Sequence, residues 1–193
     1  MEETNNTSNN YNKNVALENR ELSRVQLLIL YFLFFSFIGW LLETFYSVYE
    51  LGHFTNRGFL YGPICPIYGY GALILILFFT KYKNKSIRLF IYSAVVFSMF
   101  EYAVGYCMDA LFSMKWWDYS NEFFNLNGRI SILYSFVWGI IAILFVNHIY
   151  PFFSKKFYKV LSKIPYKVQI YSLYFLIMCF AIDNVFSFVR YLT

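Results

Sequence analysis

Four carboxylate side chains lie inside stretches of the chain that are otherwise apolar enough to cross a membrane: Glu43, Glu101, Asp109 and Asp183. An ionised carboxylate at the centre of a bilayer costs about 3 kcal/mol or more unless it has a hydrogen-bonding partner, a proton or a water-filled cavity. Acids at such positions mark ion pathways, proton relays and substrate sites. These four acids are therefore the first functional candidates.

Basic and aromatic residues accompany the acids. Arg57 and Arg129 each stand next to a glycine, in the runs 56–58 and 127–129, where the backbone can turn. We expect them at the mouth of a polar cavity, where a guanidinium can hold an anionic group. The predicted substrate- or ion-binding residues are Glu43, Arg57, Glu101, Asp109, Trp117, Asp118, Asn127 and Arg129.

A purely architectural explanation competes with this one. Buried acids often pair with arginines, and three arginines, counting Arg190, could neutralise three of the four acids. Glu101 is the exception because it lies deepest in its apolar stretch and farthest from those arginines. The pair Trp116-Trp117 is equally open to two explanations, an aromatic belt at the membrane surface or a ligand platform.

The sequence contains no motif of the common nucleotide-binding, hydrolase or metal sites. The chain has no GxxxxGK[ST], GxSxG or HExxH motif, so nothing in it assigns a catalytic residue, and an enzyme is the less favoured interpretation. His53 has no second His or Cys close by, so we predict no metal and no cofactor. A disulfide between Cys65 and Cys107 and separate membrane-buried thiols both remain open.

The composition places these residues in membrane helices. Of the 193 residues, 59% are hydrophobic and only 14% are charged, against about 25% charged in soluble domains. We predict an all-α integral membrane bundle of about five transmembrane helices in a single domain, residues 25–193, after a disordered polar tail, residues 1–24. The predicted spans are 25–48, 63–81, 88–112, 130–150 and 168–190. The start of the second, at 61–66, is either a first helical turn that tolerates proline or a broken or re-entrant entry.

The basic residues predict the orientation. Twelve of the 16 Lys and Arg fall in the tail, in the loop 81–88 and in the segment 151–167. The positive-inside rule then places the N-terminus in the cytoplasm and the C-terminus outside, in the cytoplasmic membrane. We assign the positive charge to the lipid bilayer rather than to nucleic acid. The segment 151–167 is either an anchor on the inner leaflet or a docking element for a cytoplasmic partner.

Helical spacing groups the polar residues on particular faces. Glu101, Gly105 and Asp109 recur at i, i+4 and i+8, which places them on one face of the third span. The fourth span carries a stripe of small residues that permits close helix contact: Ser131, Ser135, Gly139 and Ala142. We expect these faces to surround a polar cavity that opens to the outside.

Seven runs carry a family resemblance. In chain order they are Gly39-Trp40-Leu41-Leu42-Glu43, Asn56-Arg57-Gly58-Phe59-Leu60-Tyr61-Gly62-Pro63, Pro66-Ile67-Tyr68-Gly69-Tyr70-Gly71-Ala72-Leu73, Glu101-Tyr102, Trp116-Trp117-Asp118-Tyr119-Ser120, Phe124-Asn125-Leu126-Asn127-Gly128-Arg129-Ile130 and Trp138-Gly139. Over residues 30–153 the chain resembles a bacterial membrane-protein family, the putative ABC-transporter type IV (CmpB-like) group. The resemblance implies a multi-pass membrane protein with a transport role, and a separate cytoplasmic ATPase that would dock on the segment 151–167. It assigns no substrate and no catalytic residue.

Three functions follow as hypotheses. The first is a permease-like transport component with an outward-facing polar cavity lined by carboxylates and arginines. The second is an enzyme of the outer leaflet that acts on a lipid or cell-envelope substrate, with paired carboxylates as acid and base. The third is a non-catalytic membrane subunit or assembly factor. Acids that are bonded to arginines would favour architecture, whereas two free acids around an open cleft would favour catalysis.

Overall fold

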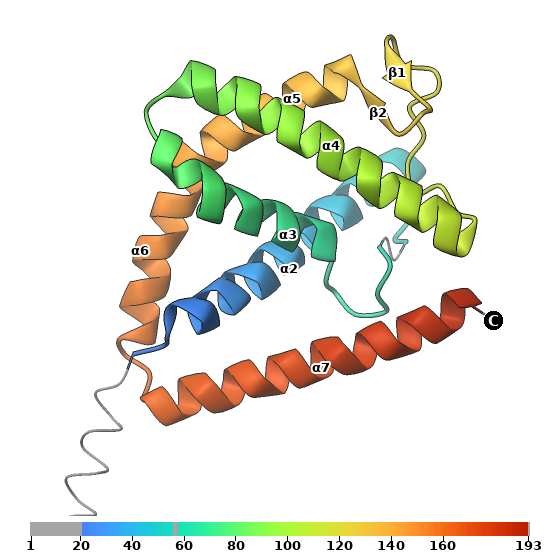
Figure 1. Cartoon of the computed structure of the whole chain (residues 1–193). Helices are drawn as coiled ribbons and strands as arrows, with labels where there is room; N and C mark the ends of the chain where they lie inside the picture. Colours follow the sequence, from blue (N-terminus) through green and yellow to red (C-terminus); the bar gives the residue numbers. More distant parts are fainter. Residues whose placement is uncertain (1–20, 56–57, 193) are drawn as a thin grey trace, which may run out of the picture. The chain divides into compact units, whose positions relative to one another are not determined.

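The computed structural model describes residues 21–55 and 58–192 (Figure 1). Most of the predicted tail, residues 1–20, and the candidate site residue Arg57 lie outside the described residues. The helices in chain order are α2 (Arg24–Leu51), α3 (Pro66–Ile74), α4 (Ser86–Phe112), α5 (Ile132–Leu144), α6 (Tyr150–Leu161) and α7 (Tyr166–Leu192). Strands β1 (Asn125–Leu126) and β2 (Ile130–Ser131) form a small antiparallel hairpin.

The all-α membrane fold is confirmed. Within the described residues, four helices are long and apolar enough to cross a bilayer: Arg24–Leu51, Ser86–Phe112, Ile132–Leu161 and Tyr166–Leu192. At most a third of the most apolar window of each is buried inside the protein. Helices that are apolar on every side and yet exposed are expected where lipid covers them.

The second and fourth spans differ in detail from the prediction. The second is a shorter apolar helix, Pro66–Tyr82, in which α3 continues through a π-helical turn, Leu75–Phe79, and a 3₁₀ turn, Thr80–Tyr82. It begins at Pro66 rather than at residue 63, because residues 61–65 form an irregular entry. The fourth continues past residue 150, since a π-helical turn, Phe145–Ile149, joins α5 directly to α6.

Local signals explain where α2 and α5 begin. The Ser23 hydroxyl accepts from the Gln26 backbone N–H at 3.3 Å, and the Gln26 side chain accepts from the Ser23 N–H at 2.8 Å, which is a capping box. Ser131 caps α5 in the same manner by accepting from the Tyr134 N–H. Helix α2 ends at Gly52, whose φ of 71° is a left-handed conformation that glycine adopts readily.

The chain divides into two compact units. The first unit holds the described residues up to Gly69 together with Ser154–Ser187, which means α2, the start of α3, most of α6 and most of α7. The second holds Tyr70–Phe153 and the end of α7 from Phe188, which means α4, α5, the hairpin and the remainder of the second span. The single-domain organisation stays a prediction.

In the first unit, the face of α2 that carries Ser36 and Gly39 packs against the start of α3. A Cβ atom on Gly69 would collide with the Ser36 hydroxyl, and a Cβ on Gly39 would collide with the Tyr68 ring. The Cys65 N–H donates to the Ser36 carbonyl at 3.0 Å, which fixes the entry of α3 against α2. Small residues at these positions therefore allow the two helices to approach closely.

In the second unit, α4 packs against α5 through the predicted stripe of small residues. The hydroxyls of Ser98 and Ser135 lie 2.6 Å apart, and Ser131, Gly139 and Ala142 are buried. A Cβ on Gly139 would lie 2.5 Å from the Phe90 ring. The predicted close contact along this stripe is confirmed, and it sets the register in which α5 faces the acids of α4.

Candidate functional site

Glu101 lies near the middle of α4 and is 5% exposed. Its Oε1 accepts from the Tyr119 hydroxyl at 2.9 Å, and its Oε2 accepts from the Trp138 indole N–H at 3.0 Å. The two donors come from the segment between α4 and α5 and from α5 itself. Both are neutral, and no Lys or Arg of the described chain makes a salt bridge with this carboxylate.

Aromatic packing holds both donors in place. The Tyr119 ring stacks on Tyr134 with centroids 4.1 Å apart, and the Trp138 ring stacks on Phe97 at 5.6 Å. The Tyr119 backbone N–H also donates to the Gly128 carbonyl at 2.8 Å. The carboxylate therefore sits between two rings whose orientations are fixed by their neighbours, as a preorganised binding group requires.

Asp109 lies two turns farther along α4 and forms an ion pair with Arg129 of the segment 113–131. The Arg129 guanidinium donates to the Asp109 carboxylate at 2.7 Å, and the two side chains are 18% and 34% exposed. The guanidinium also lies over the rings of Tyr102 and Tyr106, about 5.6 Å and 5.5 Å from their centroids. Stacking and pairing together suit the planar, delocalised charge of arginine better than that of lysine.

Gly105 makes room for this arrangement. A Cβ on Gly105 would lie 3.2 Å from the Trp117 ring and 3.6 Å from the Arg129 side chain. The Trp117 indole N–H donates to the Arg129 carbonyl at 2.9 Å. Glu101, Gly105 and Asp109 share one face of α4, as the sequence predicted. The segment 113–131 folds back onto that face.

The segment 113–131 is held by its own polar residues. The Asn127 amide donates to the Tyr102 hydroxyl at 3.0 Å. The Asp118 carboxylate accepts from the hydroxyl and, at 2.9 Å, from the backbone N–H of Ser120, and it lies 3.6 Å from the Lys115 ammonium. These hydrogen bonds, and then the nearby Lys115 charge, hold the pKa of Asp118 below its usual value.

The second unit thus brings together six of the eight predicted site residues: Glu101, Asp109, Trp117, Asp118, Asn127 and Arg129. We call the five side chains at its centre the α4 polar cluster; they are Glu101, Asp109, Tyr119, Arg129 and Trp138. Within the described residues, no three His, Cys, Asp or Glu side chains come close enough to hold a metal ion. The cysteines at 65, 107 and 179 are free thiols.

The other two predicted residues belong to the first unit. Glu43 is half-buried on α2 and accepts from the Tyr68 hydroxyl at 2.6 Å. Arg57 lies outside the described residues, so its predicted place at a cavity mouth stays a prediction.

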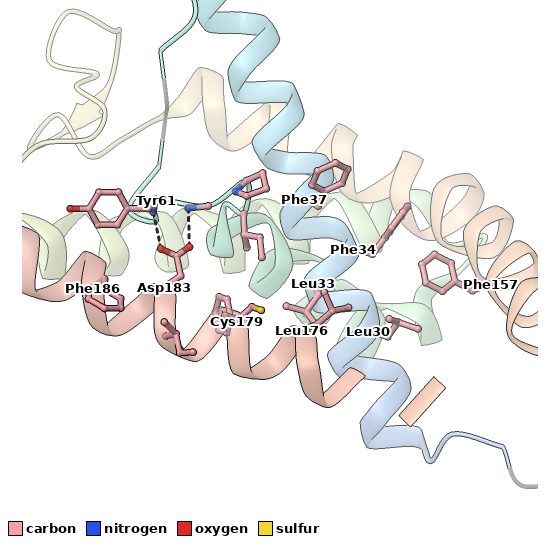
Figure 2. Close-up of a pocket in the computed structure, with 15 residues that line it drawn as sticks. Leu30, Leu33, Phe34, Phe37, Tyr61, Phe157, Leu176, Cys179, Asp183 and Phe186 are labelled. Atoms are coloured by element: carbon pink, nitrogen blue, oxygen red, sulfur yellow. Dashed lines mark hydrogen bonds between the residues drawn. The ribbon is translucent and has the colours of Figure 1, made fainter. Parts of the chain in front are cut away.

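Asp183 departs from the arginine pairing considered above. Its carboxylate accepts from the backbone N–H groups of Tyr61 and Gly62 at 3.0 and 2.9 Å (Figure 2). It also accepts from the Ser187 hydroxyl at 3.2 Å. A carboxylate on α7 therefore satisfies backbone donors in the irregular entry to the second span. This explains how an unwound backbone is tolerated there.

Two members of the α4 polar cluster were absent from the predicted site. Tyr119 and Trp138 stand in runs that carry the family resemblance, but neither was named as a site residue. A usable signal was present, since a half-buried Trp or Tyr usually finds an acceptor for its N–H or O–H. Glu101 was the acid without an obvious partner.

The chain also matches a known protein family. A family model described as "Putative ABC-transporter type IV" matches residues 30–188, which covers α2 from Leu30 to most of α7. The chain belongs to this family. The type IV match extends beyond the motif runs at 30–153 to include the last span and Asp183. Comparisons with curated proteins and with solved structures give no match.

Proposed function

We propose that this multi-pass membrane protein is the permease-like component of a transporter, and that the α4 polar cluster lines its outward-facing polar cavity. The family and the membrane-spanning helices support a transporter-like protein. The finer proposal rests on the surroundings of Glu101. This carboxyl group is buried in an apolar span, and among the described residues its hydrogen bonds come from two neutral donors. Ionisable groups so placed are typical of substrate and ion pathways.

Each member of the cluster has a role in this proposal. Glu101 binds a cation or a proton, because no Lys or Arg among the described residues forms a salt bridge with it. Asp109 and Arg129 form the outer lining, where their partial exposure leaves them within reach of a polar solute. Glu43 and Arg57 are further candidates for the lining and the mouth. The charge distribution supports an N-terminus in the cytoplasm and a place in the cytoplasmic membrane.

The ion pair argues against the enzyme hypothesis. A general acid or base must be available to exchange a proton with a substrate. The Asp109 carboxylate is engaged by the Arg129 guanidinium, so it is not available as the second acid of a catalytic pair. A solute-binding site can use such a pair without proton exchange.

A separate cytoplasmic ATPase is the proposed energy source, docked on the segment 151–167. In this segment α6 presents Lys155 and Lys159, both exposed, on an amphipathic helix. An ATPase that bears an acidic groove would complement this surface.

Affinity purification in mild detergent tests the proposal. The full-length chain, tagged and expressed in its own host, is recovered from membranes with its bound proteins. We expect an ATP-hydrolysing subunit to copurify, and to be lost when Lys155 and Lys159 are both replaced by Gln. Recovery of the chain without any ATPase, at several detergent strengths, argues against the transporter proposal.

A second measurement addresses the cavity. The copurified complex, reconstituted in vesicles, is assayed for ATP-driven solute flux with wild type, Glu101→Gln and the control Glu122→Gln, an acid of the 113–131 segment outside the cluster. We expect Glu101→Gln to abolish flux and the control to retain it. Normal flux in Glu101→Gln at normal expression would remove Glu101 from the site.

A further inference from the structure

The first unit contains an apolar groove that the proposed transport function does not use. Its volume is about 940 Å³, and it lies between α2 and α7 with the irregular segment 61–64 at one end (Figure 2). Leu33, Phe34 and Phe37 line it from α2, and Leu176 and Phe186 line it from α7. The two helices that flank this groove are both candidate membrane spans.

One end of the groove is closed by an aromatic contact with α6. Phe157 contacts Phe34 edge-to-face with ring centroids 4.8 Å apart, and it contacts Tyr31 in a tilted arrangement at 5.4 Å. The Tyr158 hydroxyl donates to the Glu21 carboxylate at 2.8 Å, which ties α6 to the start of α2. On the other side, the Gln169 amide of α7 donates to carbonyls at the end of α6 and in the turn that follows. Glu21, shortly before the start of α2, and the first turn of α7 are therefore both bonded to α6 or to the turn that follows it, at this end of the groove.

Exposed bases gather at the same end. Arg24 opens α2, Lys163 lies in the turn after α6, and Lys167 lies in the first turn of α7, and all three are exposed. The acid Glu21 is also there, but it accepts from the Tyr158 hydroxyl. A cluster of bases at the membrane ends of two helices attracts anionic lipid headgroups.

We infer that the groove binds one acyl chain of an anionic phospholipid whose headgroup lies among Arg24, Lys163 and Lys167. Along α2, Leu30 and Phe37 lie about 9 and 20 Å from Arg24, at 1.5 Å per residue. One leaflet of the hydrocarbon core is about 15 Å thick. The part of the groove from Leu30 to the middle of the bilayer is therefore at the depth that the acyl chain of a lipid anchored at those bases reaches.

The far end of the groove suits an uncharged occupant. Asp183 is an acid in the lining, and its oxygens accept from Tyr61, Gly62 and Ser187. The remaining lining is apolar side chains, apart from the Cys179 thiol and the backbone of the 61–64 segment. A hydrocarbon chain fits such a lining, whereas a polar solute would leave its own groups unsatisfied.

Native mass spectrometry of the full-length protein in mild detergent tests this inference. The probes are a phosphatidylglycerol and a phosphatidylcholine with the same acyl chains, titrated separately. We expect the anionic lipid to be retained at one site and the zwitterionic lipid to bind about a hundredfold more weakly. Replacing Arg24, Lys163 and Lys167 together by Gln should weaken the anionic lipid by about the same hundredfold, because each base near the headgroup contributes a factor of about five.

Two variants on α7 separate the groove from the general lipid surface. Leu176→Trp fills the groove and should abolish retention of the anionic lipid. Val185→Trp is the matched control, since Val185 is exposed on the same helix and does not line the groove, and it should leave retention unchanged.

Three results would overturn the inference. The first is equal retention of the two lipids. The second is retention that survives both Leu176→Trp and the triple base variant. The third is a dimer in the wild type that Leu176→Trp dissociates, because the groove would then hold a second copy of the chain. Copurification of an ATPase is a different readout, so failure of one proposal leaves the other testable.

Discussion

Replacement of Glu101 by Gln or by Leu should have very different effects on stability, because of what its two partners can donate and accept. The Trp138 indole N–H can only donate, whereas the Tyr119 hydroxyl can donate or accept. In Glu101→Gln, the amide oxygen can accept from Trp138 and the amide NH₂ can donate to Tyr119. Both hydrogen bonds survive if the Tyr119 hydroxyl reverses its direction.

The magnitudes follow from the two bonds, at 2.9 and 3.0 Å, and from the 5% exposure of Glu101. Glu101→Leu leaves two donors without an acceptor, at roughly 1–3 kcal/mol each. At about 2–4 °C per kcal/mol for a chain of this size, the melting temperature should fall by roughly 5–20 °C. Glu101→Gln exchanges charged for neutral bonds and also removes a buried charge, so a change within about 1 kcal/mol is expected.

Thermal unfolding of the full-length protein in mild detergent provides the assay, followed by intrinsic fluorescence and by loss of monodisperse protein. Tyr119→Phe is the matched control, because it removes one donor and keeps the ring that stacks on Tyr134. It should fall between the other two variants. Equal destabilisation by Gln and Leu would show that the charge itself holds the structure, and an unchanged melting temperature in Glu101→Leu would refute the hydrogen-bond argument altogether.

Three further predictions concern other parts of the chain. Asp183→Asn should lower the free energy of unfolding by about 1–3 kcal/mol, since one amide oxygen cannot replace two carboxylate oxygens toward the N–H groups of the 61–62 backbone; an unchanged melting temperature would contradict this. Gly128→Ala should cost about 1–2 kcal/mol or more, because Gly128 has a φ of 67° and a Cβ would lie 2.5 Å from both Asp118 and Ser120 oxygens; tolerance by the fold would show that the segment relaxes. The pKa of Asp118 is lowered in the folded protein, so its contribution to stability is present above the pKa of the unfolded chain, about 3.9, and is lost as pH falls through the folded pKa. The difference in melting temperature between wild type and Asp118→Asn should therefore vanish in acid. A difference that persists in acid would contradict this role of Asp118.

The helices could be predicted from the sequence because their signals are local. Long apolar runs predicted five helical segments, and the shared face of Glu101, Gly105 and Asp109 followed from a period of 3.6 residues. The entry to the second span could not be placed in the same way. Its backbone donors are satisfied by Asp183, more than 120 residues away in the chain. No local pattern around Tyr61 records that partner.

The partners of the acids could not be predicted from the sequence for the same reason. Trp138 reaches Glu101 only because small residues such as Gly139 bring α5 against α4 in one register. The stripe predicted that the helices approach, but not which α5 side chain would face the carboxylate. Arginine was the expected partner for three of the four acids, and it is the observed partner of Asp109.

Three of the acids have different kinds of partner. The Asp109 carboxylate accepts from the charged Arg129 guanidinium. The Asp183 oxygens accept from two backbone N–H groups, which can only donate, and from the Ser187 hydroxyl. In both positions the carboxylate satisfies donors that would otherwise be left without an acceptor.

Glu101 has a tyrosine hydroxyl among its partners, and a hydroxyl can either donate or accept. A proton on Oε1 can be donated to the Tyr119 hydroxyl oxygen, while Oε2 continues to accept from Trp138. The carboxyl group can therefore gain and lose a proton, or release a cation, while both hydrogen bonds persist. Glu43 shares a reversible tyrosine partner, Tyr68, but it is only half-buried. Of the acids in the membrane spans, Glu101 thus combines deep burial with a surrounding network that tolerates both charge states, which is what a transport step at this position requires.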